Sequence, residues 1–323
     1  MKRYGNLFEK IIDIDNLLLA HYNARKGKTH YSEVQEIDKD PIFYCEQIQQ
    51  MLINNTYNVS NYRIKEIYEP KHRIIYILPY YPDRIIQHAI MQIINPIFES
   101  TFISTSYAAR KGKGLHEASY KLRQYLQDKS NTLYCLQFDI QQFYPSINHN
   151  ILKSFINKKI KCKQTLNLIN TIIDSNKLGI PIGNYISQLF GNIYLNELDH
   201  YIKEQLHCKY YIRYCDDGII LDKYKYNLIN IKQLIKTYVQ KICLTLKSST
   251  IIYPSYIGID FLGYIHYNNY TKLRKSIKLK MIKTLKHIHI INNPISVIAS
   301  YKGWLIHCNG ETLYNKYITN NFY

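Results

Sequence analysis

The sequence has no long apolar run and no regular cysteine pattern. Residues Met1 to Arg3 are followed by Glu9, Lys10 and Asp13 instead of an uninterrupted hydrophobic stretch, which argues against a signal peptide and a membrane span. The seven cysteines are odd in number and scattered, and none forms a Cys-x-x-Cys pair. Neither a disulfide framework nor a zinc site is therefore predicted, and we expect a cytoplasmic protein without membrane contact.

Acidic residues are scarce compared with basic ones. The chain has 24 Asp and Glu against 42 Lys and Arg, a net charge of +18, together with 33 tyrosines. A polyanion is the natural partner, because basic charge attracts phosphates and aromatic rings stack on bases. The bias is strongest from Thr271 to Tyr323, where nine Lys and Arg stand against Glu311 alone. This concentration favours an element that grips nucleic acid over a solvated basic surface.

Internal repeats, low-complexity linkers and known phosphate-loop signatures are also missing. The basic glycine loop from Ala108 to Gly114 contains Gly-Lys-Gly, but it lacks the Walker ending and the dinucleotide spacing. It predicts a flexible basic loop, in which Arg110 and Lys111 are candidate contacts to primer or template. The length of 323 residues exceeds that of a usual single domain, so we expect subdomains.

The most informative feature present is a pair of adjacent carboxylates, Asp216 and Asp217. They lie between strand-like runs at 210–213 and 218–221, of which the first alternates as a half-buried strand, and Asp217-Gly218 is a strong hairpin-turn signal. Adjacent ionised carboxylates repel unless a bound divalent cation neutralises them. An ordinary Asp-Asp-Gly turn is the alternative interpretation.

A third carboxylate, Asp139, ends another strand-like apolar run at 133–138. Carboxylates brought together from strand ends make an open Mg²⁺ site, because Mg²⁺ takes one or two protein carboxylates and leaves its other positions to water and phosphate. The three acids therefore indicate a two-metal arrangement for phosphoryl transfer.

The remaining pattern predicts several helices and one further hairpin. Helical spacing occurs at Leu7 to Leu18 and at Cys45 to Leu52, and again from Ile85, where Pro96 is expected to end the helix. Strands at 64–68 and 73–78 form a hairpin across a proline-containing turn. The segment 178–198 predicts a turn feeding an amphipathic helix, with one face free to meet substrate.

The order of these motifs resembles that of reverse transcriptases. A strand ending in Asp139 is followed five residues later by an aromatic residue, Tyr144, and then by Tyr-x-Asp-Asp on a hairpin. Most reverse transcriptases carry Gln-Gly-x-x-x-Ser-Pro between these two motifs, whereas this chain has Ile182 to Gln188. That version resembles the reverse transcriptases of diversity-generating retroelements, as do the chain's start and the segments 81–89, 258–264 and 301–307.

The resemblance implies an α+β right-hand polymerase with an antiparallel palm sheet and a helical thumb. Its expected parts are fingers with an N-terminal extension at 1–132, palm at 133–150 and 178–269, a fingers/palm insertion at 151–177, and thumb at 270–323.

The resemblance also assigns roles to individual residues. Asp139, Asp216 and Asp217 would hold two Mg²⁺ ions, for which Mn²⁺ could substitute, with the Ile140 carbonyl as a further ligand. Tyr144 would be the aromatic gate against a ribose 2′-hydroxyl, and Lys247 would lie near the leaving pyrophosphate. The other nucleotide contacts would be Lys71, Arg73, Ile182, Gly183 and Gln188. Primer and template would meet Phe261, Leu262, Gly263 and Tyr264 of a primer grip, and Lys272, Arg274, Lys275 and Lys278 of the thumb.

The activity so implied is RNA-directed DNA synthesis from deoxynucleoside triphosphates in a bacterial or phage-encoded system. A template-repeat RNA would be copied into cDNA with frequent errors at adenines, diversifying a target gene with help from a basic, oligomeric accessory protein. Ile182 offers a reason for the errors, because an aliphatic side chain in place of a glutamine amide removes one polar constraint near the templating pair.

Other classes of protein stay open at this point. Retron-like and antiphage-defence reverse transcriptases are also compact, and Ser187-Gln188 is the main discriminator. Group II intron maturases share the core, but we expect no room for their additional regions before Tyr323. A non-enzymatic RNA-binding protein would have the same charge, although three placed carboxylates argue against it, because acid near phosphates costs affinity without metal.

Overall fold

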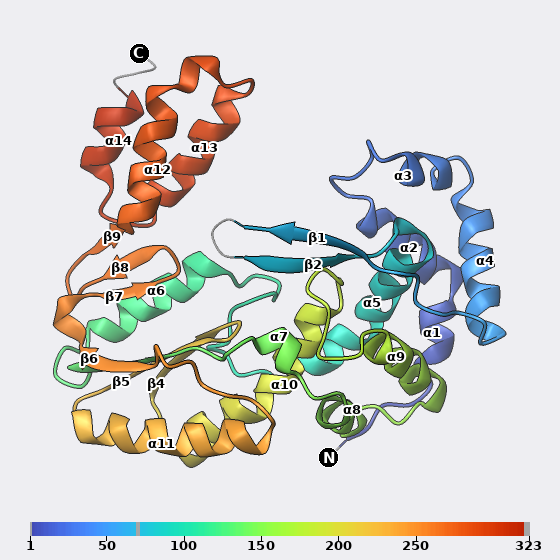
Figure 1. The fold of residues 1–323 in the computed structure, drawn as a ribbon, viewed down its shortest axis with the longest axis horizontal. Coiled ribbons are helices and arrows are strands. Elements are labelled where there is room, and N and C mark those ends of the chain that lie inside the picture. Colours follow the sequence, from blue (N-terminus) through green and yellow to red (C-terminus); the bar gives the residue numbers. More distant parts are fainter. Residues whose placement is uncertain (1, 69–71, 320–323) are drawn as a thin grey trace. The chain divides into compact units, whose positions relative to one another are not determined.

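The computed structural model describes residues 2–68 and 72–319, which form two compact units (Figure 1). Unit 1 comprises Met1–Ile103, Ile140–His200 and Tyr238–Thr245, and unit 2 comprises Ser104–Asp139, Tyr201–Thr237 and Leu246–Tyr323. No helix in the described part of the chain is both long enough and apolar enough to cross a bilayer.

Unit 1 begins with a group of packed helices, as the helical patterns predict. They are α1 (Phe8–Ile12), α2 (Ile14–Ala24), α3 (Ser32–Ile37), α4 (Pro41–Ile53) and α5 (Ile85–Glu99), with a short π-helix, η1 (Tyr80–Arg84), leading into α5. Aspartates start two of them: the Asp13 carboxylate accepts hydrogen bonds at the N-terminus of α2 and the Asp40 carboxylate does so at α4, which satisfies amides left free at a helix start. Buried apolar side chains of α2 and α5 face each other across the group.

Pro96 does not end α5, so this detail of the prediction is wrong. The helix continues to Glu99 with Pro96 inside it. A proline removes one backbone hydrogen bond, but here it stands in the last turn of the helix. Ile97 and Phe98 are buried just beyond it, and their burial holds that turn in place.

The predicted hairpin in unit 1 is confirmed. Strands β1 (Arg63–Ile67) and β2 (Arg73–Ile77) pair antiparallel, with Ile67 opposite Arg73. All five residues of β1 are exposed, so the hairpin gains little from packing on its outer strand.

The second part of unit 1 consists of α7 (Phe143–Ser146), α8 (His149–Asn157), α9 (Lys163–Asp174) and α10 (Ser187–His200). The expectation of an amphipathic helix at α10 is wrong. Ten of its residues are buried, including Gly191, Tyr194 and Asp199, because neighbouring segments cover the helix on nearly all sides. It therefore has no broad face free for substrate, and only residues at its start, such as Gln188, are exposed.

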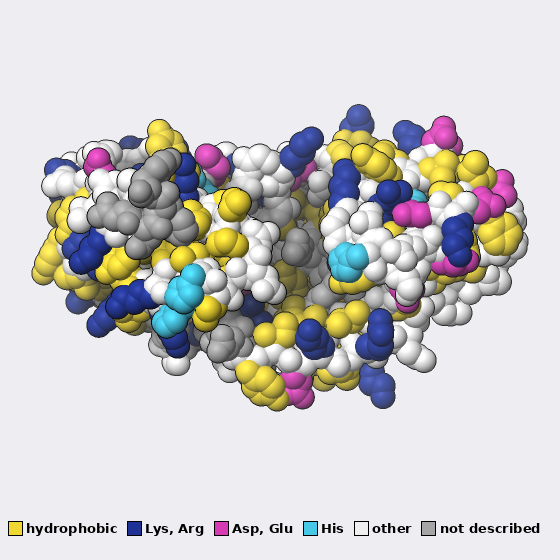
Figure 2. Space-filling view, turned by 90° about the horizontal axis from the view of Figure 1, so that it is seen from above, with side chains coloured by type: hydrophobic (Ala, Val, Ile, Leu, Met, Phe, Trp, Pro, Cys, Tyr) yellow, Lys and Arg dark blue, Asp and Glu magenta, His cyan; other side chains and the backbone are white. Residues whose placement is uncertain are grey.

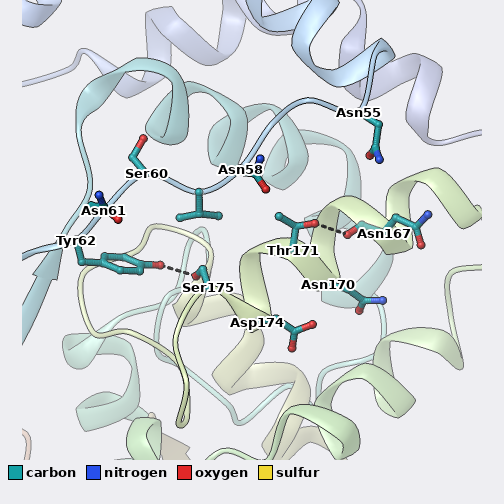
Figure 3. A pocket seen from close by; sticks show the side chains of 11 residues that line it. Asn55, Asn58, Ser60, Asn61, Tyr62, Asn167, Asn170, Thr171, Asp174 and Ser175 are labelled. Carbon is teal, nitrogen blue, oxygen red and sulfur yellow. Dashed lines mark hydrogen bonds between the residues drawn. The ribbon is translucent and has the colours of Figure 1, made fainter.

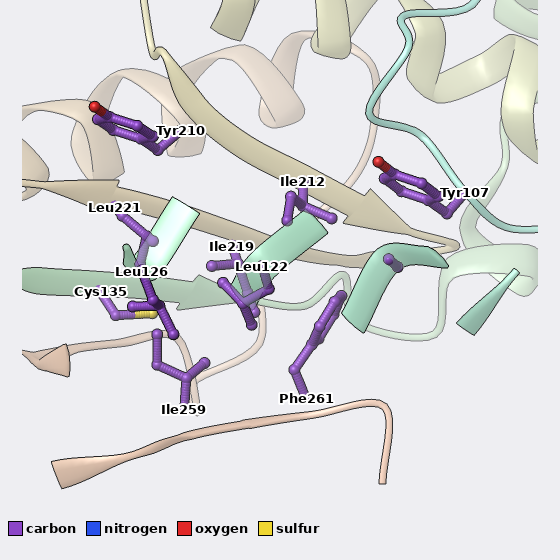
Figure 4. Close-up of a cluster of buried hydrophobic side chains, with 11 residues drawn as sticks. Tyr107, Leu122, Leu126, Cys135, Tyr210, Ile212, Ile219, Leu221, Ile259 and Phe261 are labelled. Carbon is purple, nitrogen blue, oxygen red and sulfur yellow. The ribbon is translucent and has the colours of Figure 1, made fainter. Parts of the chain in front are cut away.

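Unit 2 is built on a four-stranded antiparallel sheet with the order β4-β5-β3-β6. The strands are β3 (Tyr134–Phe138), β4 (Tyr210–Tyr214), β5 (Asp217–Asp222) and β6 (Ile251–Pro254). Figure 1 shows α6 (Leu115–Leu126) along one face of this sheet and α11 (Lys225–Lys241) along the other. A short π-helix, η2 (Tyr201–Gln205), precedes β4 in the chain. The core between α6 and the sheet includes Leu122, Ile212 and Ile219, each at most 1% exposed (Figure 4).

The last part of unit 2 joins a small sheet to a helical bundle. The sheet contains β7 (Ile259–Phe261), β8 (Tyr264–His266) and β9 (Thr271–Leu273), and the bundle contains α12 (Lys275–Lys286), α13 (Pro294–Leu305) and α14 (Glu311–Tyr317), with the short helices η3 (Ser255–Ile257) and η4 (Ile288–Ile290). Tyr264, Met281 and Leu305 are buried in one core shared by sheet and helices. The helical region expected after Tyr270 thus starts with a strand, and its first helix begins at Lys275.

Candidate active site

Strand register brings the predicted carboxylates together in unit 2. β3 and β5 pair antiparallel with Phe138 opposite Gly218, so Asp139 leaves β3 beside Asp217 and the tip of the β4–β5 hairpin. Asp216 stands at that tip. The sequence placed each acid at a strand end, and the pairing of β3 with β5 makes them neighbours.

The hairpin turn is two positions earlier than the predicted Asp217-Gly218 turn. Tyr214 pairs with Asp217, so the two loop residues are Cys215 and Asp216, and Asp217 already belongs to β5. Cys215 takes the left-handed conformation, φ 53°, as hairpin loops of two residues require. The buried Arg213 side chain donates from Nη1 to the Cys215 carbonyl at 2.8 Å, which supports the turn from below.

Gly218 is needed in the strand and not in the turn. A Cβ atom at this position would lie 2.1 Å from Cζ of Phe138, so only glycine lets the Phe138 ring cross the strand. The prediction of a half-buried β4 is also wrong, because Tyr210 to Arg213 are all buried. Helix α6 and the segment at 104–107 cover this strand, and the backbone amide of Arg213 donates to the Thr105 carbonyl at 3.0 Å.

Burial and neighbouring charge change the protonation of the site. Burial, the Asp139 carboxylate and, to a smaller extent, the Asp217 carboxylate together raise the pKa of the Asp216 carboxyl to about 7. Burial and a neighbouring negative charge both favour the protonated form of a carboxyl over its ionised form.

Lys247 is paired with the Asp139 carboxylate. Its backbone amide donates to the Asp139 carbonyl at 2.8 Å and its ammonium donates to Asp139 Oδ2. The expected role of Lys247 at a leaving pyrophosphate would require this ammonium to leave Asp139. Asp139 Oδ1 is buried and receives no hydrogen bond within the described residues.

These features fit a divalent cation. Asp139 Oδ1 is a buried oxygen that no donor of the described residues reaches, and burial together with the Asp139 carboxylate raises the pKa of the neighbouring Asp216. Two carboxylates suit Mg²⁺, which fills its remaining positions with water and phosphate. Among residues 2–68 and 72–319, no group of three or more His, Cys, Asp or Glu side chains is arranged to hold a metal ion.

Tyr144, the expected sugar gate, lies in unit 1 at the short helix α7. Its carbonyl accepts a hydrogen bond from the Ile180 amide at 2.9 Å, and its ring is partly exposed. A Cβ on Gly191 would lie 3.4 Å from Cε1 of this ring, so α10 supports the ring from behind. Gln142, two residues before Tyr144, has φ 45°, which turns the chain sharply after Asp139.

The loop at 182–188 is held on several sides within unit 1. The Tyr76 amide of β2 donates to the Ile182 carbonyl at 2.8 Å. A Cβ on Gly183, which has φ 129°, would lie 2.1 Å from the Tyr76 carbonyl oxygen, so only glycine allows this approach. The Ile182 side chain is partly exposed, and the Gln188 side chain is exposed.

Two residues that sequence reasoning missed anchor the same loop. The buried Gln87 side chain accepts a hydrogen bond from the Ile186 amide at 3.3 Å. The His88 ring stacks on Tyr185 at 3.8 Å, with 1° between the planes. Polar residues inside the otherwise apolar α5 were the available signal, since α5 buries both of them.

The remaining candidates for nucleotide or metal binding are Arg73, Lys71 and Ile140. Arg73 is exposed at the start of β2. Lys71 lies outside the described residues. Ile140 is 1% exposed and follows Asp139 directly, but it falls in unit 1. The assignment of its carbonyl to a metal stays a prediction.

The predicted primer grip is the β7–β8 turn. Phe261 and Tyr264 are buried, and Leu262 and Gly263 form the turn with φ 52° and 85°. A Cβ on Gly263 would lie 2.7 Å from Trp304 and Ile277. The close approach that glycine permits here is therefore to helices α12 and α13, a contact that the sequence did not reveal.

The basic candidates lie in unit 2. Arg110 donates to the Ser106 carbonyl at 2.6 Å in the 108–114 loop, where Lys111 is exposed. Arg274 pairs with Asp260, whereas Lys275 and Lys278 are exposed at the start of α12. The Lys272 ammonium lies 5.4 and 5.0 Å from the ring centroids of Tyr267 and Tyr270. Figure 2 shows more Lys and Arg than Asp and Glu on its left side.

Comparison with known proteins identifies the family. The model described as reverse transcriptase (RNA-dependent DNA polymerase) matches residues 65–266, more than half of the chain. The chain therefore belongs to the reverse transcriptase family, as predicted.

Individual relatives are similar over shorter regions. Protein YkfC of Escherichia coli (strain K12) is 28% identical over 140 residues, which are 40% of this chain and 37% of YkfC. The group II intron-encoded protein LtrA of Lactococcus lactis subsp. cremoris is 29% identical over 135 residues, 39% of this chain and 22% of LtrA.

A solved structure supports the fold. Apo telomerase from Candida Tropicalis superposes with a TM-score of 0.51 at 15% identity, over 65% of this chain and 48% of that one. The predicted α+β right-hand polymerase fold is confirmed. The chain spans less than half the length of each of these three proteins.

Proposed function

We propose that this protein is an RNA-directed DNA polymerase whose catalytic carboxylates are Asp139, Asp216 and Asp217. The observation that carries the proposal is the meeting of Asp139 and Asp216 at the β3 and β5 strand ends, inside the region matched by the family model. A primer 3′-hydroxyl would attack the α-phosphate of a deoxynucleoside triphosphate in line. Bound Mg²⁺ would supply activation of the attacking oxygen and stabilisation of the leaving pyrophosphate.

The chain's own residues would orient the reactants. Asp139 and Asp216 would hold the metals, with Asp217 and the Ile140 carbonyl beside them. Arg73 would bind the triphosphate, and Tyr144 would crowd a ribose 2′-hydroxyl. The 182–188 loop would contact the templating pair, and the β7–β8 turn and α12 would bind primer and template. Template RNA, cDNA and deoxynucleoside triphosphates are thus the partners.

We assign the protein to the diversity-generating type of reverse transcriptase. The sequence Ile182 to Gln188 supports this assignment, together with the partly exposed side chain of Ile182. The product would be cDNA of a template-repeat RNA with errors at adenines, made with a basic accessory protein. A retron-like or antiphage-defence enzyme is the second candidate, because the family match by itself does not distinguish these types of reverse transcriptase.

The decisive experiment measures DNA synthesis on a primed RNA template with Mg²⁺ or Mn²⁺. Asp216→Asn is expected to lower synthesis by at least about a thousandfold, because metal catalysis contributes several kcal/mol, and to leave RNA binding nearly unchanged in gel shifts. Asp40→Asn is the matched control, since Asp40 is exposed and Asn also caps a helix.

Synthesis by Asp216→Asn near the wild-type rate would reject the carboxylate site. RNA binding without any synthesis by the wild type would favour a non-enzymatic RNA-binding protein. Sequencing the cDNA separates the two enzyme candidates, because errors concentrated at template adenines are expected only of the diversity-generating type.

A further inference from the structure

A polar pocket of about 630 Å³ lies in unit 1, and all of its lining residues belong to that unit. Its walls are the segment that leads into β1 and one side of helix α9 (Figure 3). Five asparagines line it: Asn55, Asn58, Asn61, Asn167 and Asn170. A pocket volume in the range of about 300–1,000 Å³ suits a small organic ligand, such as a nucleoside.

The helix presents a polar stripe to this pocket. Asn167, Asn170, Thr171 and Asp174 are three and four residues apart and all line the pocket, as expected for one helical face. The opposite face of α9 is buried through its apolar residues, such as Ile169 and Ile173. The helix is thus anchored in the core, and its polar face has a defined orientation.

The amide groups in the pocket are available for a ligand. Within the described residues, the side chains of Asn55, Asn61, Asn167 and Asn170 make no hydrogen bond to protein, and Asn58 makes one long bond of 3.4 Å to the Thr56 carbonyl. Each amide offers two donor hydrogens and one acceptor oxygen. Such groups match the edges of nucleobases, which carry donors and acceptors side by side.

The charge of the pocket is unusual for this chain. None of its lining residues is Lys or Arg, although the chain carries 42 of them. Its one carboxylate, Asp174, is paired with Lys153 at 2.5 Å and with His149 at 3.3 Å. The part of a ligand that contacts these lining residues is therefore expected to be neutral. A phosphate group is excluded as the main recognised feature, because it would require positively charged partners.

A hydrogen-bonded chain connects the pocket to the 182–188 loop. The Tyr62 hydroxyl, at the pocket wall, lies 2.7 Å from the Ser175 hydroxyl and accepts from Asn184 Nδ2 at 2.9 Å. Asn184 is 5% exposed, and its Oδ1 has no donor in the described part of the chain. Ligand binding in the pocket would thus affect the hydrogen bonds that hold a loop that also contains Ile182 and Gly183.

We propose that this pocket binds an unpaired nucleobase of a single-stranded nucleic acid, with adenine preferred. Asparagine can pair with adenine through two hydrogen bonds, one to N6 and one to N7. The inference deepens the proposed function, on which it rests for the nucleic-acid partner. It adds a base-reading contact apart from the metal site and from the phosphate-binding lysines.

The test measures binding of short oligoadenylate, oligocytidylate and oligouridylate RNA, and of oligodeoxyadenylate, by fluorescence anisotropy over a range of salt. Asn167→Ala combined with Asn170→Ala is expected to weaken oligoadenylate binding about tenfold, since one base contact corresponds to about 1–3 kcal/mol. Binding of the pyrimidine RNAs should change little. The slope of log affinity against log salt should stay unchanged, because no charge is removed.

The controls separate folding and the two nucleic acids. Asn157→Ala removes an exposed asparagine from α8 outside the pocket and should bind like the wild type. Alanine favours helix, so the double variant should melt no lower than the wild type. Asn170→Asp is a second variant, which should also lose oligoadenylate binding. Equal losses with oligodeoxyadenylate assign the site to any single strand, and losses confined to RNA assign it to the template.

The proposal is overturned if the wild type shows no preference for adenine, or if the double variant and Asn157→Ala lose binding equally. Because the assay needs neither primer nor nucleotides, it is independent of polymerase activity. A failure of the proposed function would instead appear as absent DNA synthesis with the adenine preference retained.

Discussion

The aspartate site of unit 2 and the asparagine pocket of unit 1 use similar side chains in opposite settings. Asp139 and Asp216 are ionisable, crowded and largely buried, and burial with mutual repulsion raises the pKa of Asp216 to about 7. The asparagines are neutral and mostly exposed. A buried carboxylate pair requires a cation to be stable in its ionised form, whereas amides can bind and release a base without a counter-charge.

The difference indicates which kind of contact each unit contributes. Under the proposed function, charged contacts with metal and phosphate lie mainly in unit 2, where residues 271–323 carry nine Lys and Arg against one Glu, and neutral contacts lie mainly in unit 1, at Tyr144, Ile182 and the pocket. We expect the charged contacts to control the affinity for nucleic acid and the rate of synthesis, and the neutral contacts to control which sugar and base are selected. The predictions below test this division, beginning with the largest expected effect.

Removing charge from the thumb should break the salt dependence of nucleic-acid binding. Changing Lys272, Arg274, Lys275 and Lys278 to Gln should lower the slope of log affinity against log salt by up to about 3, because each phosphate contact to a single strand releases about 0.7 counterion. At about 0.1 M salt the affinity should fall on the order of a hundredfold.

The control for this prediction removes equal charge from unit 1. Four exposed residues there can be changed to Gln: Lys10, Lys26, Lys39 and Lys163. If both variants flatten the slope equally, total charge and not the thumb controls binding, and the comparison between the units fails.

Deleting the Tyr144 ring should weaken selection of the sugar. Tyr144→Ala opens space beside α7, so discrimination against ribonucleotides should fall by roughly ten- to a hundredfold, the effect of about 1–3 kcal/mol of lost steric exclusion. Incorporation rates of matched ribo- and deoxynucleotides measure it, and Tyr226→Ala, at an exposed site on α11, is the control. Unchanged selectivity would assign Tyr144 to packing against α10.

His88 should make unit 1 sensitive to acid. Burial and the neighbouring Arg84 lower the pKa of His88 to about 4, whereas an unfolded histidine has a pKa of about 6.5. The unfolded state therefore binds more protons between these values, and stability should decline as the pH falls from about 6.5 to 4, by at most ~1.4 kcal/mol per pH unit. Stability is retained above pH 6.5.

Replacing His88 separates its contribution to the acid sensitivity of stability from the contribution of unit 2. His88→Phe keeps a ring for Tyr185 and should reduce the acid sensitivity seen in thermal melts. Burial also lowers the pKa of His266 to about 4, so unit 2 should retain its own share. His287→Gln, at an exposed position, should change nothing. A His88→Phe curve parallel to that of the wild type would contradict the prediction.

The smallest expected effect concerns fidelity. Ile182→Gln restores an amide that most reverse transcriptases carry and should lower errors opposite template adenine a few-fold, because a site that hydrogen-bonds the correct geometry rejects misfits better. Sequencing cDNA made on an adenine-rich RNA gives the error spectrum, and Ile182→Val is the apolar control. Slower synthesis with an unchanged spectrum would mean that the amide is merely buried without a partner.

Much of the candidate site could be predicted from local pattern. The strand before Asp139 and the hairpin carrying Asp216 follow from apolar runs and turn residues, which act over a few positions. The turn itself was misplaced by two residues, because Gly218 signals a turn locally but serves to admit the Phe138 ring from another strand. The burial of α10 escaped prediction for the same reason, since covering segments come from elsewhere in the chain.

The sequence by itself determined the class of protein: the order of the acidic motifs, the positive charge and the polymerase family. Only the tertiary structure decided which groups meet. Strand register made Asp139 and Asp216 neighbours and gave Asp216 its raised pKa, and the packing of α9 against the segment before β1 gathered five asparagines around one pocket. Composition and local periodicity depend on neighbours along the chain, whereas pKa values and pockets depend on distances between residues that are far apart in it.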